Sequence, residues 1–407
     1  MTSPDAPLLI AGGGIGGLSA ALALTRRGIS VRVLEAEPEF SESGAGIQIG
    51  PNGSRLLRSW GLGAQLDAHC GRPGAIQVHD GVTGAALATI PLGRVAEDRY
   101  GSPYYVAERR VLHRLLLDAV RNAPLAEITP SFRVAEVLIS GDDVTALAGD
   151  NREANGRALI GADGVHSRIR GIFLDGDAVF SGRNAWRATM SGESATTAAQ
   201  DNDVHLWIAP RAHLVHYRCG PAGPLNAVAV VGGEAASPGW GAPGDSARLM
   251  GFFDDWAEAP RRLLEGFADW MCWPLMSVEA LPSWTRGPVA LLGDAAHPVM
   301  PFLASGAVMA MEDAAVLAVE LSRDGGAGDI TAAFRRYEHQ RTSRLARVQR
   351  ASVRMGEIYH MSGTMRLARN LTMSALPGRR LLTRNDWLYG YKADADDSAP
   401  TPTTAAY

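Results

Sequence analysis

A cluster of glycines near the beginning of the chain restricts the possible folds more than any other feature. The GxGxxG spacing falls on three of them, Gly12, Gly14 and Gly17. The apolar run 8–11 precedes the cluster, an Ala- and Leu-rich segment, 18–27, follows it, and a second apolar run, 30–34, ends at Glu35. This order predicts a strand–helix–strand unit in which the turn and the helix N-terminus approach a pyrophosphate and Glu35 accepts a hydrogen bond from a ribose hydroxyl. We therefore expect a dinucleotide-binding site, and the motif leaves open whether the dinucleotide is NAD or FAD.

Composition excludes several other classes of protein. With 407 residues, 46% hydrophobic residues and a net charge of −4, the chain is long enough for roughly two or three globular units and has no basic surplus for nucleic acid. Its three cysteines, Cys70, Cys219 and Cys272, lack the spacing of a zinc motif, so we expect buried thiols and no metal. The uncharged segment 6–25 has the length of a membrane span, but its glycines favour strand, turn and helix. We expect a cytoplasmic protein without a membrane span.

Two later segments repeat the pattern of a strand followed by a glycine and an acid. The apolar run 158–160 precedes an Asp-Gly pair at 163–164, and the run 290–292 precedes a Gly-Asp pair at 293–294. A long amphipathic segment follows the second pair, and we expect its helix to begin near residues 304–306. The free N–H groups of that helix would favour negative charge nearby.

These three motifs, in this order, resemble those of the group A flavoprotein aromatic hydroxylases, the family typified by para-hydroxybenzoate hydroxylase. The resemblance spans residues 8–350. It implies an α/β fold: a Rossmann-like βαβ FAD-binding domain with an inserted, mostly antiparallel β-sheet substrate domain and C-terminal helices. We place the FAD-binding domain at 1–178 and 287–350, the substrate domain at 179–286, and the C-terminal helices and tail at 351–407.

The resemblance also implies which residues contact FAD. They are Gly12, Gly14, Ile15, Gly16, Gly17, Glu35, Arg109, Asp163, Asp294, Pro301, Gly306 and Ala307. In the family, the first glycines and the acid hold the ADP half of FAD, and the aspartate matching Asp294 holds the ribityl chain. This chain has Glu108 before Arg109 where the family usually has histidine. For Asp163, a role as a turn residue that bonds to its own backbone is an open alternative.

One strand of the expected substrate domain carries candidate catalytic residues. Its alternation places His213, Val215 and Tyr217 on one face and Leu214 and His216 on the other. A phenol with a pKa of about 10 is only about 0.1% ionised at pH 7, so its activation needs a base. We predict that His213 takes the phenol proton and that Tyr217 orients the substrate and relays the proton. The alternative is that His213 is only a surface histidine on a strand.

Several segments are most similar to the 3-hydroxybenzoate 6-hydroxylase subgroup. These segments are 46–52, 104–105, 213–217, 302–313 and 386–391. In the subgroup, the residues matching Tyr105, His213 and Tyr217 lie in the substrate pocket, which implies the same for this chain. The pocket glutamine of the subgroup falls at Pro301. The related 6-hydroxynicotinate 3-monooxygenases have proline there and a histidine next, where this chain has Phe302.

The resemblance implies a FAD-dependent monooxygenase that uses NADH or NADPH and O2 to hydroxylate a small phenolic aromatic acid resembling 3-hydroxybenzoate. A decarboxylative hydroxylase of the salicylate or 6-hydroxynicotinate type is the nearest alternative. A halogenase is disfavoured because it would need a tunnel lysine and the only lysine is Lys392. The alternative from another class is a catalytically silent dinucleotide-binding interaction protein.

The Met-rich segment 355–373 fits either a homodimer interface or internal packing, and the arginine run in 331–350 is expected to face solvent.

Overall fold

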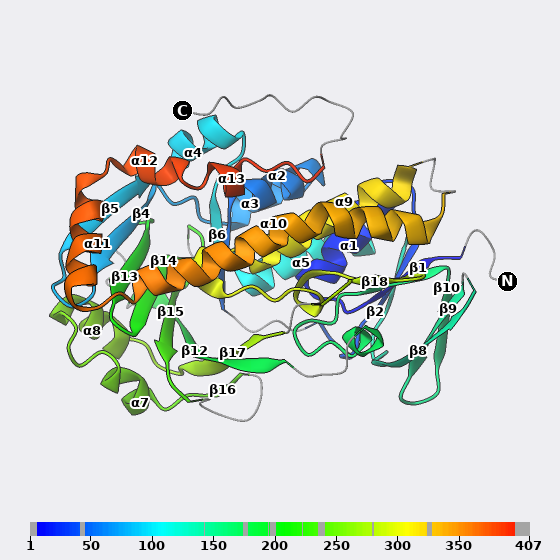
Figure 1. The fold of residues 1–407 in the computed structure, drawn as a ribbon, viewed down its shortest axis with the longest axis horizontal. Helices are drawn as coiled ribbons and strands as arrows, with labels where there is room; N and C mark the ends of the chain where they lie inside the picture. Colours follow the sequence, from blue (N-terminus) through cyan, green and yellow to red (C-terminus); the bar gives the residue numbers. More distant parts are fainter. Residues whose placement is uncertain are drawn as a thin grey trace.

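The computed structural model describes residues 6–40, 45–141, 143–173, 178–193, 195, 201–221, 223–234, 241–278, 281–323 and 328–394. Figure 1 shows an elongated molecule with one large sheet at each end and the long helix α10 (Ile330–Tyr359) running between them.

The first sheet carries the glycine-rich turn. Within the described residues its six strands lie in the order β18-β19-β11-β1-β2-β7. Their bounds are β1 Leu8–Ala11, β2 Val31–Leu34, β7 Ala126–Thr129, β11 Ala158–Gly161, β18 Thr285–Arg286 and β19 Val289–Leu291. All neighbours pair in parallel except β18 and β19. Helix α1 (Ile15–Thr25) packs against α5 (Arg109–Arg121) and α9 (Gly306–Ser322). The predicted strand–helix–strand unit is confirmed, and β1 is apolar throughout because all four of its residues are buried.

The second sheet is mostly antiparallel, as predicted. Within the described residues its eight strands lie in the order β16-β17-β12-β15-β14-β13-β4-β5, and only β13 and β4 pair in parallel. Their bounds are β4 Ala75–Asp80, β5 Ala86–Pro91, β12 Val179–Met190, β13 Val204–Ala209, β14 Ala212–Arg218, β15 Leu225–Gly232, β16 Ala242–Pro243 and β17 Met271–Ser277. Helices α7 (Ser246–Gly251) and α8 (Glu258–Glu265) bury apolar side chains against it.

Two of the expected domain boundaries differ from the structure. Strands β4 and β5 belong to the second sheet although they lie within the segment 1–178 that was assigned to FAD binding. The boundary at residue 350 falls inside α10, which continues without a break to Tyr359. Both differences arise from pairing and packing between segments that are distant in the sequence.

The molecule has two smaller sheets and further helices besides the two large sheets. A three-stranded sheet comprises β8 (Val134–Ser140), β9 (Asp143–Ala148) and β10 (Glu153–Gly156), and a two-stranded sheet pairs β3 (Gly46–Ile49) with β6 (Tyr105–Glu108). The remaining helices are α2 Pro51–Ser59, α3 Gly63–His69, α4 Gly93–Tyr100, α11 Gly363–Ala375, α12 Gly378–Thr383 and α13 Asp386–Tyr389. Short 3₁₀ helices are η1 Ile169–Ile172, η2 Gly293–Ala295 and η3 Pro301–Leu303.

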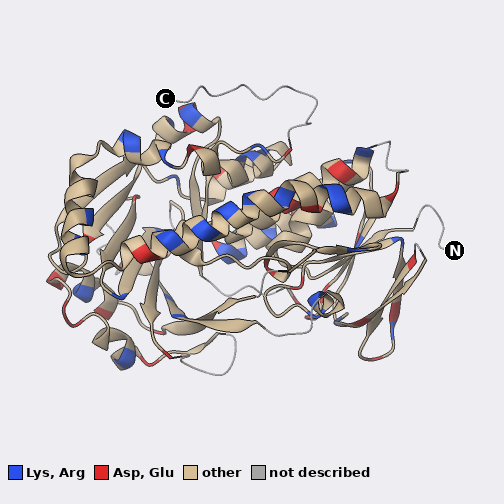
Figure 2. Cartoon of the chain, viewed as in Figure 1, with Lys and Arg blue, Asp and Glu red and all other residues tan. Residues whose placement is uncertain are grey.

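Helix α10 is rich in arginine, but not all of these arginines face solvent. Figure 2 shows basic residues along its length. Arg341 is completely buried and donates to Glu312 at 2.8 Å and to Asp313 at 2.7 Å, both on α9. Arg344 also donates to Glu312, at 2.9 Å. The expectation of a solvated arginine face is therefore wrong for this part of the helix, whose arginines join α10 to α9.

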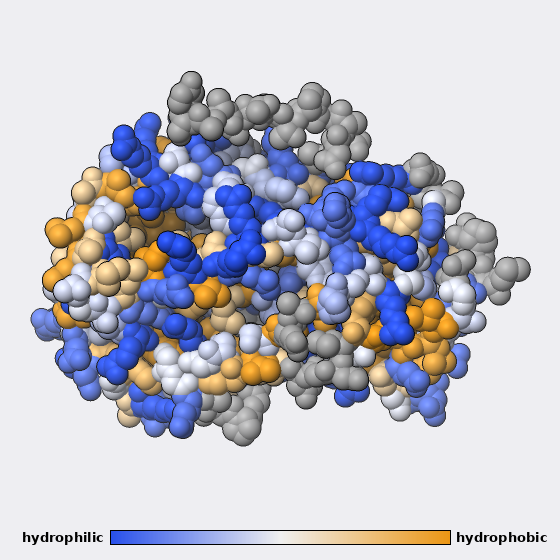
Figure 3. Space-filling model, viewed as in Figure 1, coloured by the Kyte–Doolittle hydropathy of each residue, from blue (hydrophilic) through white to orange (hydrophobic). Residues whose placement is uncertain are grey.

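Cys70, Cys219 and Cys272 are free and buried, as predicted. In the described part of the chain, every helix is too short or too polar to span a lipid bilayer. Exposed apolar side chains gather on α11, among them Leu367 and Leu371, at the end of the molecule where Figure 3 shows apolar surface.

Candidate functional site

The glycine-rich turn has the geometry of an anion-binding site. Gly12 has a φ of +106°, and a Cβ atom on it would lie 2.5 Å from the carbonyl oxygen of Ala162. A Cβ on Gly17 would lie 1.9 Å from the carbonyl oxygen of Gly12. In contrast, no described atom lies within 4 Å of the Cβ position of Gly14, the N-cap of α1, and no side chain caps this helix. The uncapped N–H groups of α1 therefore face open space, which fits a pyrophosphate.

Glu35 connects the end of β2 to this turn. Its Oε2 accepts a hydrogen bond from the backbone N–H of Gly13 at 2.6 Å, and its Oε1 accepts from the N–H of Glu37 at 2.8 Å. Each carboxylate oxygen can accept more than one hydrogen bond. Glu35 can therefore hold the turn in place and still accept from a ribose hydroxyl.

The Gly-Asp segment lies against the glycine turn. A Cβ on Gly16 would lie 3.0 Å from the Leu292 side chain and 3.3 Å from that of Ala310 on α9, so a glycine lets α1 pack closely here. Ile15 is buried beside it. The fold thus brings together two motifs that are about 280 residues apart in the sequence, as the right-handed connections of parallel sheets allow.

A buried carboxylate fixes the Gly-Asp turn. Asp313 on α9 accepts from the N–H of Gly293 at 3.0 Å, from His297 Nε2 at 2.6 Å and from Arg341 Nε at 2.7 Å. Burial alone would raise the pKa of Asp313, but His297 and Arg341 outweigh it and lower the pKa to about 2. Asp313 is therefore ionised at neutral pH, and the turn is held by a charged hydrogen-bond acceptor.

Asp294 itself projects from this turn. Asp294 is exposed to solvent. Desolvation by the surrounding protein raises the pKa of its carboxyl, and the positive charges of Arg109 and His297 oppose this shift. A carboxylate with access to water remains ionised at neutral pH. Arg109 begins α5 and is half-buried. The structure thus brings Asp294 and Arg109 together, as expected for two residues that contact one cofactor.

The N-terminus of α9 is a second uncapped helix end. The helix begins at Gly306, which confirms the start predicted near residues 304–306. No side chain caps it, and no described atom lies within 4 Å of the Cβ position of Gly306. Ala307 is half-buried in the same turn, and Pro301 begins the preceding η3. This end has room and free N–H groups for an electron-rich part of a cofactor.

Asp163 has a different environment. Its carboxylate accepts from the Ser167 hydroxyl, from the N–H of Arg168 at 2.8 Å and from the N–H of Ile169 at 3.3 Å. These contacts stabilise the turn that leads into η1, which fits the alternative role of Asp163 as a turn residue. A contact between Asp163 and FAD stays a prediction.

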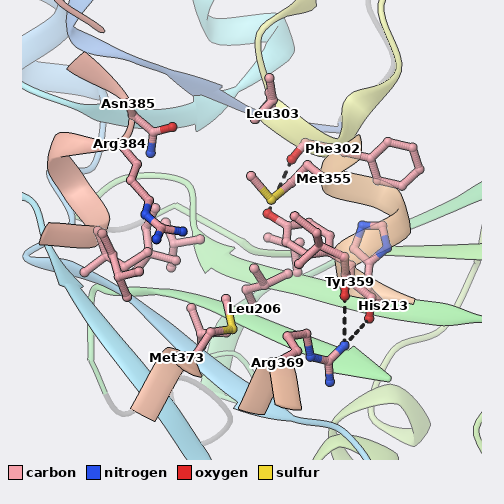
Figure 4. A pocket seen from close by; sticks show the side chains of 18 of the residues that line it. Leu206, His213, Phe302, Leu303, Met355, Tyr359, Arg369, Met373, Arg384 and Asn385 are labelled. Atoms are coloured by element: carbon pink, nitrogen blue, oxygen red, sulfur yellow. Dashed lines mark hydrogen bonds between the residues drawn. The ribbon is translucent and has the colours of Figure 1, made fainter. Parts of the chain in front are cut away.

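A cavity of about 440 Å³ lies between the second sheet, η3 and the C-terminal helices. Apolar side chains from β4, β5, β13, β14, α10, α11 and α12 form most of its wall, and its polar members are Gln48, Tyr104, His213, Tyr359, Arg369, Thr372, Arg384, Asn385 and Tyr389. Figure 4 shows Arg384 and Asn385 on the side of the cavity away from His213 and Phe302. Because residues 301–304 line the cavity just before α9 begins, the cavity opens next to the second uncapped helix end. Such a pocket fits a small, mostly apolar ligand with a few polar groups.

His213 lies in the wall of this cavity, together with Val215 from the same face of β14. The side chain is buried, and Phe302 and Tyr359 pack against its ring at centroid distances of 5.5 Å and 5.3 Å. Its Nδ1 lies 3.0 Å from Nε2 of His360, the residue after α10. Burial, with smaller effects of His360 and Arg183, lowers the pKa of His213 well below its usual value. His213 is therefore neutral at pH 7 and is not the surface histidine of the alternative interpretation.

The structure corrects the assignment of Tyr105. The Tyr105 hydroxyl hydrogen-bonds with Asp67 and accepts from Arg58 at 2.9 Å and from Arg72 at 3.1 Å, outside the cavity. Tyr104 lines the cavity instead and donates to Oε1 of Gln48 at 2.7 Å. Adjacent side chains of an extended segment point in opposite directions, so only one of the two tyrosines can face the ligand.

Tyr217 is buried on the face of β14 that also carries His213 and Val215, but it is not part of the cavity wall. A Cβ on Gly46 would lie 2.6 Å from the Tyr217 hydroxyl oxygen, so this hydroxyl lies beside β3. Burial raises its pKa well above the usual value. A contact between Tyr217 and substrate stays a prediction.

Sequence reasoning missed two residues of the cavity, Arg369 and Arg384, and His360, which contacts His213. His360, Arg369 and Arg384 come from the C-terminal helices, which were separated from the substrate domain. No motif marks them, because only the packing of α10 to α13 against the second sheet brings them to the site. The two glycine-bearing turns and the uncapped ends of α1 and α9 define a dinucleotide-binding protein with an adjoining apolar cavity.

Comparisons with known proteins identify the family. The family model for an FAD binding domain matches residues 5–232 and 260–352. The chain is 36% identical over 388 residues to 3-hydroxybenzoate 6-hydroxylase from Polaromonas naphthalenivorans, covering 95% of this chain and 96% of the relative. It is 34% identical over 349 residues to 6-hydroxynicotinate 3-monooxygenase from Bordetella bronchiseptica, covering 85% and 90%. The crystal structure of Klebsiella pneumoniae HpxO with FAD and uric acid superimposes with a TM-score of 0.82 at 27% identity, covering 94% of this chain and 97% of that one. The chain belongs to this FAD-binding family of flavin-dependent monooxygenases.

Proposed function

We propose that the protein hydroxylates a small phenolic aromatic acid, with O2 as oxidant and NADH or NADPH as reductant of FAD. The observation that carries the proposal is the apolar cavity that begins at residues 301–304, beside the uncapped end of α9, and contains His213. The two relatives are named for 3-hydroxybenzoate and 6-hydroxynicotinate, both ring acids that carry a hydroxyl group. A ring of that size fits in a cavity of about 440 Å³.

FAD would be held by the α1 turn, Glu35, Arg109, Asp294 and the α9 N-terminus, and when bound it supplies the chemistry that activates oxygen. The residues of the chain have other tasks. The apolar wall excludes water from the reacting ring, which protects reactive intermediates from hydrolysis. Because a phenol of pKa about 10 is about 0.1% ionised at pH 7, forming the reactive phenolate requires roughly 4 kcal/mol. His213 is the side chain placed to lower this requirement.

We assign the acid group of the substrate to Arg384. This arginine reaches into the cavity, and no described side chain or backbone group pairs with its guanidinium. The other arginine of the cavity, Arg369, already donates to the carbonyl oxygens of Ile358 at 3.0 Å and Tyr359 at 2.6 Å. Arginine binds carboxylates in a planar, two-point geometry, which would orient the ring.

The experiment that tests the function is a panel of hydroxybenzoates and hydroxynicotinates added to the FAD-loaded protein. Each is scored by stimulated NADH or NADPH oxidation and by mass spectrometry of the product. We expect stimulation and a product one oxygen atom heavier. Release of CO2 with the hydroxylation would instead assign the protein to the decarboxylative type. Absence of stimulation by every phenolic acid would refute the proposal.

We also propose that the protein forms a homodimer, supported by the exposed apolar residues Val353, Met365, Leu367 and Leu371 at the end of α10 and on α11. Light scattering of the purified protein tests this, with twice the chain mass of 43.1 kDa expected. A single-chain mass at micromolar concentration would contradict it.

A further inference from the structure

Three side chains form a continuous chain of nitrogen contacts that ends in the cavity. Arg183 on β12 lies with its guanidinium nitrogen 2.5 Å from Nδ1 of His360. Nε2 of His360 lies 3.0 Å from Nδ1 of His213. Within the described chain no group hydrogen-bonds with Nε2 of His213, which is the remaining polar atom of a ring that lines the cavity. These contacts thus link Arg183 on β12, through His360 at the end of α10, to His213 on the face of β14 that lines the cavity.

The chemistry of arginine fixes the direction of every hydrogen bond in this chain. A guanidinium group has N–H donors and no acceptor, so Nδ1 of His360 must accept from Arg183. A neutral imidazole with an accepting Nδ1 carries its proton on Nε2, so His360 donates to Nδ1 of His213. By the same rule, His213 carries its proton on Nε2.

We propose that Arg183 and His360 hold His213 as an N–H donor that binds the phenolate oxygen of the substrate, rather than as the base that takes the phenol proton. This inference rests on the proposed function and revises the role first predicted for His213. In the step it describes, the O–H bond of the phenol breaks and the proton passes to water as the ligand binds. The negative oxygen then accepts from Nε2–H of His213.

The surroundings of the two histidines support this assignment. The charged and titratable groups that face the pair are Arg183 from β12, with Glu357 near it, Tyr359 beside the His213 ring, and Arg369 from α11. Burial and the two arginines lower the pKa of His360 to about 4. Because the pKa of His213 is lowered as well, both rings are neutral at pH 7, as the tautomer argument requires.

The ionisation of a bound ligand tests the proposal. The probe is 3-hydroxybenzoate bound to the oxidised, FAD-loaded protein without reductant, and its phenolate absorbance is titrated by difference spectroscopy. Arg183→Met removes the donor but keeps apolar contact with the Phe302 ring, over which Arg183 lies at 5.4 Å. We expect Arg183→Met and His360→Phe to raise the pKa of the bound phenol by about one unit, the amount that a hydrogen bond to a charged group supplies. Arg183→Lys, which also donates only, should keep the wild-type value, and so should Arg354→Met on an exposed position of α10.

An equal pKa of the bound phenol in the wild type, Arg183→Met and His360→Phe would overturn the proposal. A second measurement needs no substrate. In the ¹⁵N-histidine NMR spectrum of the FAD-loaded protein, the His213 signals, assigned by their loss in His213→Asn, should report a proton on Nε2. A proton on Nδ1 would overturn the proposal even if hydroxylation is established. If 3-hydroxybenzoate does not bind, the phenolic acid that stimulates NADH or NADPH oxidation replaces it as the probe, and the NMR result decides the tautomer without any ligand.

Discussion

Arg341 of α10 and Asp313 of α9 form a completely buried ion pair, with 2.7 Å between Nε and Oδ1. The same carboxylate holds the N–H of Gly293 at 3.0 Å, so the pair connects the C-terminal helices to the Gly-Asp turn of the cofactor site. Removing one member of a buried pair leaves an uncompensated charge.

We therefore predict that Asp313→Asn lowers the free energy of unfolding by about 3–5 kcal/mol and weakens FAD binding. Thermal unfolding and FAD titration check both effects. The control is Glu258→Gln, which breaks a pair with Arg262 whose side chains are 74% and 75% exposed, and which should change stability by less than about 1 kcal/mol. Equal stability losses in the two variants would contradict the role of Asp313.

Gly14→Val should separate binding of the cofactor from folding. Gly14 has φ −73° and ψ −176°, which valine can adopt, and no described atom lies within 4 Å of its Cβ position. We expect unchanged unfolding of the FAD-free protein and at least about a tenfold loss of FAD affinity, because the side chain would occupy the space of the pyrophosphate. Gly149→Ala, at an exposed position with equal room, is the control. Full FAD affinity in Gly14→Val would place the pyrophosphate elsewhere.

His213→Ala should retain FAD but uncouple the reaction. We expect product formation to fall by about 10², the typical loss when one donor to a developing negative charge is removed. Oxidation of NADH should then yield hydrogen peroxide. The measurement is the ratio of product formed to NADH consumed. The control is His205→Asn on the neighbouring β13; the side chain of His205 is 21% exposed. Undiminished coupling in His213→Ala would exclude His213 from the reaction.

Arg384→Met should affect only ligands that carry a carboxylate. We expect KM for a hydroxybenzoate to rise about tenfold, the effect of losing a charge-assisted hydrogen bond, with little change for a neutral phenol. Arg379→Met, at an exposed position of α12, is the matched control. A similar rise in KM for acids and neutral phenols would show that Arg384 shapes the cavity without binding the acid group.

Stability should depend on pH through His360. Its pKa is about 4 in the folded chain, below the usual 6.5, so the unfolded chain binds more protons below pH 6.5. The contribution of this histidine to the free energy of unfolding is thus complete above pH 6.5 and is lost as the pH falls toward 4. Because His360 is partly exposed, we expect a loss of about 1 kcal/mol between pH 7 and pH 5. Denaturant unfolding at both pH values checks this, and an unchanged pH dependence in His360→Gln would contradict it.

Local motifs predicted the cofactor half of the molecule well. The strand–helix–strand unit around Gly12 and Gly14 and the start of α9 at Gly306 follow from short segments whose glycines and apolar runs determine the backbone. The position of His213 in the cavity wall followed from strand alternation together with the family resemblance.

The rest of the site depends on contacts between distant segments. Strand β4 joins β13 in parallel, and the end of α10 places His360 against His213, and no local pattern predicts either contact. Which of Tyr104 and Tyr105 lines the cavity depends on which way one extended segment faces. The sequence leaves this open because the two adjacent residues are both tyrosines, and both are buried in the structure.

The central claim is that the protein inserts one atom of O2 into an aromatic ring. The most direct measurement is the reaction of the FAD-loaded protein with NADH or NADPH and 3-hydroxybenzoate under ¹⁸O2, followed by mass spectrometry of the product. We predict a hydroxylated product that carries one ¹⁸O atom and an NAD(P)H consumption close to one per product. A product without ¹⁸O, or oxidation of NAD(P)H that yields only labelled hydrogen peroxide with every phenolic acid tested, would contradict the claim.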